Sequence, residues 1–214
     1  PIDAAAVAQV LREDHGREIA ALFAVHTDTA SGTTSDLAAL RAALEAAGHP
    51  ALLVVDAVAS LAAVPLDMAA LGADVVLGAS QKGLMVPPGL AFMAVGERAL
   101  AAAHANPAPR YYWDWVRRVS GASYGKFCGT PPLALLMGLR AALGLIADEG
   151  LDAVLARHRR LAGAVHAAVA RWSEGGALRF FCTEPAARSV SVTAVAVAPG
   201  VDPEALRTVA RERF

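Results

Sequence analysis

The sequence predicts an α/β fold built around a mainly parallel sheet. Short, uninterrupted apolar runs of strand length alternate along the first half of the chain with segments whose apolar residues recur at helical spacing. That alternation is typical of parallel strands joined by helices, with both faces of the sheet covered. A hydrophobic fraction of 56% provides for a large core, and a charged fraction of 18% argues against disorder.

The elements of the first half follow one another in a regular order. Residues 35–47 carry apolar positions at helical spacing, begin with the cap signal Ser35-Asp36 and end at Gly48. Residues 51–55 are apolar without interruption, as in a strand buried on both faces. By the same reasoning we expect two more helices, at 4–14 and 67–71, and three more strands, at 19–25, 74–77 and 90–95.

The second half is organised differently. Residues 106–131 are rich in proline, glycine and aromatic residues, and we expect them to be irregular and to serve a function or an interface. Beyond them the patterns predict long helices at 133–147 and 151–172, strands at 177–182 and 189–197, and a helix from 203. This order predicts a large domain (1–150) followed by the start of a smaller α+β domain (151–214).

Composition and charge exclude several classes of function. The formal net charge of −1 gives no attraction to nucleic acid or to an anionic membrane. Aspartates interrupt the apolar stretch 51–78, so no transmembrane helix is expected. Cys128 and Cys182 are far apart, which fits reduced thiols in a cytoplasmic protein. No metal site is expected, because His26 and Asp28 lack a third ligand nearby.

Polar residues follow three of the apolar strands, at 26–29, at Asp56 and at 80–82. In open α/β sheets ligands bind at the carboxyl ends of strands. Lys82 is one of two lysines in a chain with 17 arginines. An arginine suffices for positive charge alone, whereas an amine is required for imine formation or proton transfer. We therefore interpret Lys82 as a candidate catalytic residue; the alternative is an ordinary surface lysine.

Asp56 ends an apolar strand, so we expect its carboxylate to be poorly solvated. The common role of such an aspartate is to cap a turn or a helix. The functional alternative requires a cationic partner, such as a protonated pyridine nitrogen. A carboxylate raises the pKa of that nitrogen because the opposite charges attract.

The residues around Asp56 and Lys82 resemble the class V aminotransferases of pyridoxal-phosphate (PLP) fold type I. The resemblance lies in residues 56–60, 78–84 and 87–90, and it continues in collinear order through 26–32, 112–115, 130–131, 149–151 and 156–158. Within the class the chain is most similar to the serine–glyoxylate and alanine–glyoxylate aminotransferases. The resemblance implies a PLP-binding large domain, incomplete at its N-terminus, followed by part of the small C-terminal domain.

The resemblance also implies a role for each matching residue. Lys82 would form the Schiff base with PLP and carry the proton during the reaction, and Asp56 would pair with the pyridine nitrogen. Val58 would pack against one face of the ring. Thr29 would hydrogen-bond near the 3-oxygen or the phosphate of the cofactor, and Gln81 would lie at its phosphate end.

Thr130 matches the threonine that reaches the phosphate from a neighbouring subunit, which implies a homodimer with its active site at the subunit interface. Three residues earlier, the alanine–glyoxylate enzymes carry a tyrosine on the phosphate, and this chain has Phe127. That departure is more similar to the serine–glyoxylate or pyridoxamine–pyruvate branches. Asp28 stands where many relatives have glutamate. The phosphate loop, the ring-stacking aromatic residue and the carboxylate-binding arginine of the family are expected before Pro1 and after Phe214.

The implied function is PLP-dependent transamination from a small amino acid, serine or alanine, to a 2-oxo acid such as glyoxylate. One alternative is pyridoxamine–pyruvate transamination, in which free pyridoxamine is a substrate. Another is a catalytically silent family member that acts through dimerisation, although the intact active-site motifs argue against it. We interpret residues 157–160, which include three arginines, as a solvated helix face.

Overall fold

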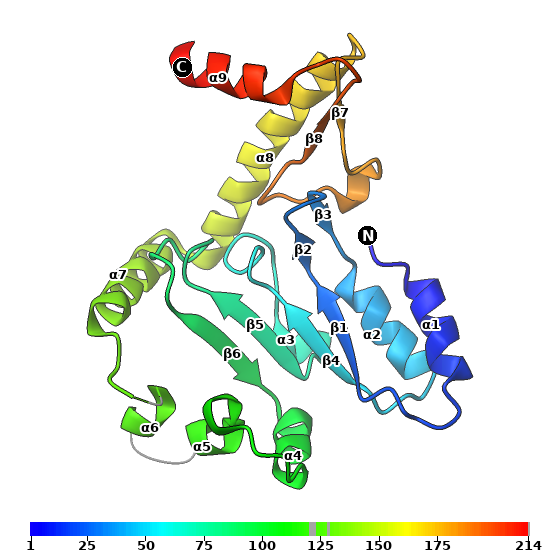
Figure 1. The fold of residues 1–214 in the computed structure, drawn as a ribbon, viewed down its shortest axis with the longest axis vertical. Coiled ribbons are helices and arrows are strands. Elements are labelled where there is room, and N and C mark those ends of the chain that lie inside the picture. The colour runs from blue at the N-terminus through cyan, green and yellow to red at the C-terminus, as the bar shows by residue number, and fades with distance from the viewer. Residues whose placement is uncertain (120–122, 128, 214) are drawn as a thin grey trace.

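A four-stranded sheet lies at the centre of the computed structural model, which describes residues 1–119, 123–127 and 129–213 (Figure 1). Its strand order is β1-β4-β5-β6, and the strands are β1 (Ala21–Val25), β4 (Leu52–Asp56), β5 (Val75–Ala79) and β6 (Ala91–Val95). β1, β4 and β5 are parallel, and β6 runs antiparallel to β5. The predicted α/β class with a mainly parallel sheet is confirmed. Cys128 lies outside the described residues.

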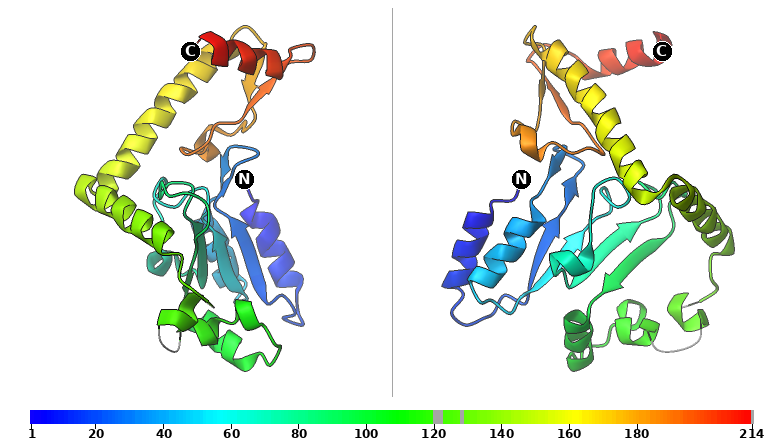
Figure 2. Two further views of the ribbon diagram at one scale, coloured as in Figure 1. Left: turned by 60° about the vertical axis from the view of Figure 1, so that its left-hand side comes forward. Right: turned by 180° about the vertical axis from the view of Figure 1, so that it is seen from behind.

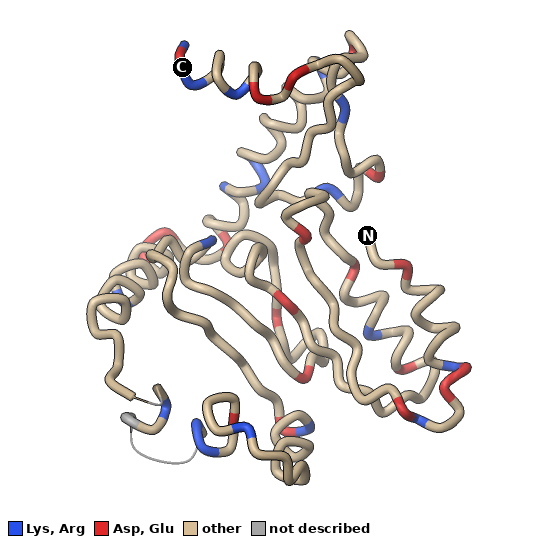
Figure 3. The backbone as a smooth tube through the Cα atoms, in the orientation of Figure 1, with Lys and Arg blue, Asp and Glu red and all other residues tan. Residues whose placement is uncertain are grey.

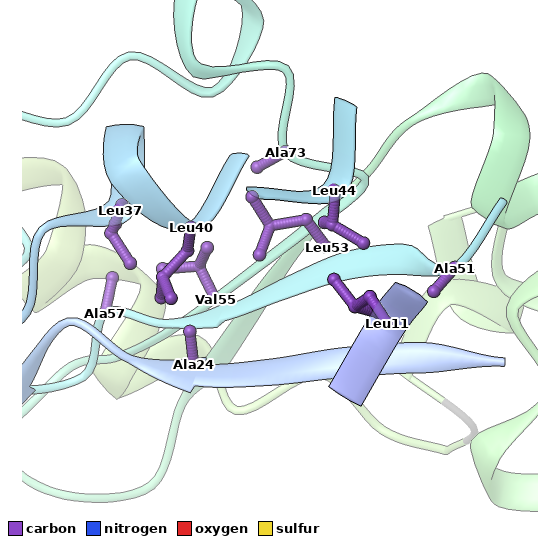
Figure 4. Close-up of a cluster of buried hydrophobic side chains, with 10 residues drawn as sticks. All are labelled: Leu11, Ala24, Leu37, Leu40, Leu44, Ala51, Leu53, Val55, Ala57 and Ala73. Carbon is purple, nitrogen blue, oxygen red and sulfur yellow. The ribbon is translucent and has the colours of Figure 1, made fainter. Parts of the chain in front are cut away.

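One face of the sheet is covered by α1 (Ala4–Glu13) and α2 (Leu37–Ala46). Each helix begins after an aspartate that caps it: Asp3 accepts from the backbone N–H of Ala5, and Asp36 from that of Ala39. The helical spacing of the leucines in α2 turns them toward β1 and β4. Figure 4 shows the resulting core cluster of Leu11, Ala24, Leu37, Leu40, Leu44, Ala51, Leu53, Val55, Ala57 and Ala73.

The opposite face of the sheet is only partly covered. Val54 and Val75 pack there against Ala99 of α4 (Glu97–Ala105). Because side chains alternate along a strand and Ala24 faces the core, Phe23 of β1 lies on this second face, where it is 74% exposed. The prediction that both faces are covered is therefore wrong for the residues that the structure describes.

The segment 106–131 is not irregular throughout. It contains a 3-10 helix, η1 (Tyr111–Trp113), and two short helices, α5 (Trp115–Val119) and α6 (Ser123–Phe127). Five residues make little more than one helical turn, so no apolar periodicity can develop over them. The prediction of an irregular segment is corrected for that reason.

The C-terminal part is built on two long helices, α7 (Leu133–Glu149) and α8 (Leu151–Ser173), which meet at Gly150. Figures 1 and 2 show α8 leading away from the central sheet to a second, smaller β unit and to α9. The expected strand at 189–197 is shorter than predicted, because only its last three residues pair with the neighbouring strand. The domain boundary near residue 150 stays a prediction. The remaining elements are α3 (Met68–Leu71), β7 (Leu178–Phe180), η2 (Pro185–Ala187), β8 (Val195–Val197) and α9 (Pro203–Arg213).

A small hairpin of β2 (Thr27–Asp28) and β3 (Thr33–Thr34) connects the sheet to the C-terminal part. The backbone N–H of Ser189 donates to the carbonyl of Gly32 in its turn, at 2.9 Å. Gly32 has φ +66°, and a Cβ there would lie 2.7 Å from the backbone nitrogen of Ala194. Only glycine permits both this backbone conformation and this close approach.

Charged residues lie mainly on helices and loops, and the four strands of the central sheet carry a single one, Asp56 (Figure 3). Across the described residues, no helix combines the length and the apolar character needed to cross a membrane.

Candidate active site

The register of the sheet brings the three polar segments to one edge. Val25 pairs with Asp56, and Asp56 pairs with Leu77, so the carboxyl ends of the three parallel strands lie side by side. The backbone N–H of His26 donates to the carbonyl of Asp56 at 2.9 Å, which extends the ladder by one residue. Lys82 follows three residues after the end of β5. Asp56 and the loop of Lys82 therefore both lie at the carboxyl edge of the sheet, where open α/β sheets bind ligands.

The carboxylate of Asp56 is half-buried and acts in part as a turn cap. Its Oδ1 accepts the backbone N–H of Val58 at 2.9 Å. Among the described residues no hydrogen bond is formed by its second oxygen. One carboxylate oxygen thus fixes the loop after β4, and the other is available for a cationic or N–H partner.

The loop that carries Lys82 is closed by the buried side chain of Ser80. Its Oγ donates to the carbonyl of Pro87 at 2.8 Å and accepts the backbone N–H of Leu90 at 3.2 Å. The backbone N–H of Met85 donates to the carbonyl of Lys82 at 2.9 Å. Bonds across both ends of the loop hold the backbone of Lys82 while its side chain stays exposed.

The backbone beside Lys82 is tightly packed and locally strained. A Cβ at Gly83 would lie 2.2 Å from the carbonyl oxygen of Leu61, so only glycine fits at this position. Ala62 and Met85 have φ angles of 63° and 58°, which are unfavourable for residues with side chains. Strained backbone of this kind persists only where the surrounding structure holds it in place, and it is concentrated at functional sites.

Lys82 lines a cavity of about 450 Å³ between the sheet edge and the C-terminal part. Thr29, at the tip of the β2–β3 hairpin, lines the same cavity, so the structure brings these two predicted site residues together. The full lining is Thr29, Ala59, Ala63, Lys82, Gly83, Met85, Val154, Arg157, His158, Ser191 and Val192.

The other predicted site residues do not line this cavity. Asp56 lies at the same sheet edge, and Val58 follows it in a half-buried turn. Gln81 is exposed next to Lys82, and Thr130 is exposed shortly before α7. Their roles in binding the cofactor stay predictions.

The sequence interpretation missed the contribution of α8. Arg159 and Arg160 are exposed, as expected of a solvated helix face, but Arg157 and His158 line the cavity. Val154 is buried at 2% exposure, and residues three and four positions later share its side of a helix. That spacing is the signal that could have assigned Arg157 and His158 to the inner face.

Two further polar residues, His26 and Asp28, lie close to the site. Burial lowers the pKa of His26, so its imidazole is neutral at pH 7. The Ser31 side chain, followed by the backbone N–H groups of Ala30 and Ser31, lowers the pKa of Asp28. Asp28 is therefore an ionised cap of the hairpin turn that carries Thr29.

These groups fit a pyridoxal-type cofactor. An exposed amine and a carboxylate with one unpaired oxygen follow the ends of β5 and β4, and a hydroxyl comes from the β2–β3 hairpin that follows β1. The amine suits an aldehyde, the carboxylate suits a protonated pyridine nitrogen, and the hydroxyl suits a phenolic or phosphate oxygen.

The chain belongs to the class-V aminotransferase family, whose model matches residues 3–213. Membership of this family implies pyridoxal phosphate as the cofactor, and the sheet and helices match PLP fold type I.

Among the relatives, the serine–glyoxylate aminotransferase of Methylorubrum extorquens is 41% identical over 92% of this chain and 49% of its own length. The L-aspartate–glyoxylate aminotransferase of Paracoccus denitrificans is 39% identical over 96% of this chain and 51% of its own. The crystal structure of pyridoxamine–pyruvate aminotransferase from Mesorhizobium loti superimposes with a TM-score of 0.84 at 35% identity, over 98% of this chain and 52% of that one. The chain spans about half the length of the curated relatives it matches.

Proposed function

We propose that this chain carries the catalytic lysine of a PLP-dependent transaminase. The reaction would move an amino group from a small amino acid, serine or alanine, to a 2-oxo acid, with glyoxylate as the expected acceptor. The observation that carries the proposal is the placement of Lys82 in a cavity at the sheet edge where Asp56 ends the neighbouring strand. Relatives named as serine–glyoxylate and aspartate–glyoxylate aminotransferases support the reaction class.

When bound, PLP supplies an aldehyde for an amine and a ring that withdraws electrons from the reacting carbon. The amine of Lys82 would hold the cofactor and then move a proton from and to the substrate carbon. The free oxygen of Asp56 would stabilise a proton on the pyridine nitrogen. Val58 would pack on the ring, and Thr29 and Gln81 would donate hydrogen bonds to oxygens at its edge.

The test compares the two lysines of the chain in the PLP-loaded protein. Lys82→Ala is expected to abolish the borohydride-fixed attachment of PLP and to lower kcat at least about 100-fold, in line with the loss of a general acid–base. Lys126→Ala is the matched control, since Lys126 is exposed on α6. Absorbance and peptide mass after borohydride treatment measure the attachment. If Lys82→Ala kept the fixed cofactor and normal turnover, the assignment would be wrong.

Pyridoxamine–pyruvate transamination is the second candidate. It is favoured by the superposition on the pyridoxamine–pyruvate aminotransferase and by a relative of that activity from Mesorhizobium japonicum at 37% identity. A protein isolated without PLP that converts pyridoxamine and pyruvate would support this candidate. A silent family member, in contrast, would give no cofactor absorbance after incubation with PLP.

We also propose a cytoplasmic homodimer in which Thr130 reaches the phosphate site of the partner subunit. Apolar side chains close to Thr130 support such an interface, because Leu133 and Met137 of α7 are 67% and 73% exposed. The two widely separated thiols support a reducing compartment. Light scattering of the holoenzyme at micromolar concentration would contradict the dimer if it gave the mass of one chain.

A further inference from the structure

Met85 has the largest apolar side chain among the described residues that line the cavity of Lys82. The other aliphatic side chains on the wall of this cavity are smaller and belong to Ala59, Ala63, Val154 and Val192. Met85 is 57% exposed, so packing inside the protein uses less than half of its surface. The rest of this flexible side chain is available to contact a molecule bound in the cavity.

The backbone holds Met85 close to Lys82. The N–H of Met85 donates to the carbonyl of Lys82 at 2.9 Å, which closes a four-residue turn. The two Cα atoms at the ends of such a turn lie less than about 7 Å apart. The N–H of Val86 donates to the carbonyl of Ser80 at 3.0 Å and holds the loop on its other side. The side chains of Lys82 and Met85 therefore start from neighbouring points of one hydrogen-bonded loop.

Met85 occupies this position although its backbone conformation is unfavourable for a residue with a side chain. Its φ angle of 58° lies in the left-handed region, which glycine adopts without the steric cost of a Cβ. Strained residues of this kind are concentrated at active sites and ligand-binding sites. The strain therefore points to a functional role for the methionine side chain.

Besides the lysine, two other large side chains on the wall are held by hydrogen bonds. Arg157 of α8 donates from Nε and Nη2 to the two carboxylate oxygens of Glu149, the last residue of α7, at 2.7 and 2.9 Å. His158 Nδ1 lies 2.9 Å from the carbonyl oxygen of Val154. The thioether of Met85 has no such anchor, since it is only a weak acceptor. Its position is set by packing, and a bound molecule must pack against it.

We propose that Met85 limits the size of the amino-acid side chain that the active site accepts. The proposal rests on the proposed function, because it places the reacting carbon of the substrate at the amine of Lys82. A cavity of about 450 Å³ has room for a branched side chain, so selection requires a group close to that carbon. A methyl or hydroxymethyl group leaves the thioether in place, whereas a branched side chain must displace it or overlap with it.

The test compares two amino acids that cannot be transaminated, 2-methylalanine and α-methylleucine, on the PLP-loaded full-length protein. Both lack a hydrogen on the reacting carbon, so the absorbance of the cofactor gives their dissociation constants without turnover. The unsubstituted protein is expected to bind 2-methylalanine more tightly than α-methylleucine. Met85→Ala is expected to reduce this preference about tenfold or more, because a single methylene group can change discrimination by about 10–200-fold.

Two variants are the controls. Met85→Leu keeps most of the bulk at this position and is expected to retain the preference. Met93 of β6 is 43% exposed and is not among the described residues that line the cavity, so Met93→Ala is expected to behave as the unsubstituted protein does.

A folding defect is not expected in Met85→Ala, because truncation of a side chain that is more than half exposed leaves no large buried cavity. Thermal melting checks this expectation. Met85→Asn provides a second test of the same preference, since asparagine is shorter and tolerates a positive φ angle.

Equal preferences in Met85→Ala and Met93→Ala would overturn the proposal, and so would equal affinities for the two amino acids in the unsubstituted protein. A loss of affinity for both amino acids by the same factor in Met85→Ala would also overturn it, because Met85 would then act on the loop of Lys82 and not on ligand size. Failure of the proposed function is seen separately, as the absence of a borohydride-fixed cofactor on Lys82 in the unsubstituted protein.

Discussion

Replacing Ser80 by alanine removes the hydroxyl that closes the loop of Lys82. The Pro87 carbonyl then loses its donor at 2.8 Å, and the Leu90 N–H loses its acceptor at 3.2 Å. Pro87 is exposed, so water can replace the donor, and this loss costs about 0.5–1 kcal/mol. Leu90 is 9% exposed, and a buried N–H left unpaired costs about 1–3 kcal/mol. Ser80→Ala should therefore lower the free energy of unfolding by about 1.5–4 kcal/mol.

Ser60→Ala is the control for this change. Both serines are fully buried, but Ser60 Oγ makes one long hydrogen bond, to the carbonyl of Ala57 at 3.4 Å. Its loss should cost about 1 kcal/mol or less. Urea denaturation of the two variants, followed by circular dichroism, gives the two free energies of unfolding. The reasoning about the loop is refuted if the two values agree within about 0.5 kcal/mol, the range of a neutral substitution.

The remaining predictions concern the hydrogen bonds of Asp14 and the close packing at Gly32. The backbone N–H of Ile19 and then that of Glu18 lower the pKa of Asp14 below 3.8. Its stabilisation is therefore present above pH 3.8 and is lost as the pH falls through the lower folded pKa. The urea midpoint of Asp14→Asn should accordingly be below that of the unsubstituted protein at neutral pH and approach it as the pH falls through the lowered pKa of Asp14; a difference independent of pH would contradict this. Gly32→Ala should cost about 2–5 kcal/mol, from backbone strain and the clash with the C-terminal part. Gly48→Ala, with φ +54° and open space, should cost only about 1–2 kcal/mol in the same urea experiment, and equal losses would argue against the clash.

The regular part of the fold could be predicted from sequence because its elements are long enough to show a period. The helices at 4–13 and 37–46 and the strands at 52–56 and 75–79 differ from their predicted ranges by only a few residues. The β2–β3 hairpin was missed because two-residue strands have no period. Cover on both faces was expected from the alternation of apolar strands and helices, but an apolar strand such as β1 carries no information about which segment packs on it.

The candidate site could be predicted where residues follow strands directly. Asp56 and Lys82 were placed at the sheet edge because parallel strands share a polarity. Arg157 and Ser191 come from a part of the chain more than 70 residues after Lys82, and they reach the cavity through the path of α8 and through contacts of the C-terminal part with the β2–β3 hairpin, such as that between Ser189 and Gly32. No pattern within a short stretch of sequence indicates that residues so far apart along the chain line the same cavity.

The ion pair between Glu149 and Arg157 also spans a corner of the backbone. Glu149 is the last residue of α7, Arg157 lies two turns into α8, and Gly150 between the helices has φ +86°. The same guanidinium therefore braces the angle at which the second helix departs. We expect a shorter or neutral side chain at this position to alter the inclination of α8, and with it the position of β7, which packs on α8. A crystallographic comparison of variants should accordingly measure the angle between the two helix axes as well as the occupancy of the cavity.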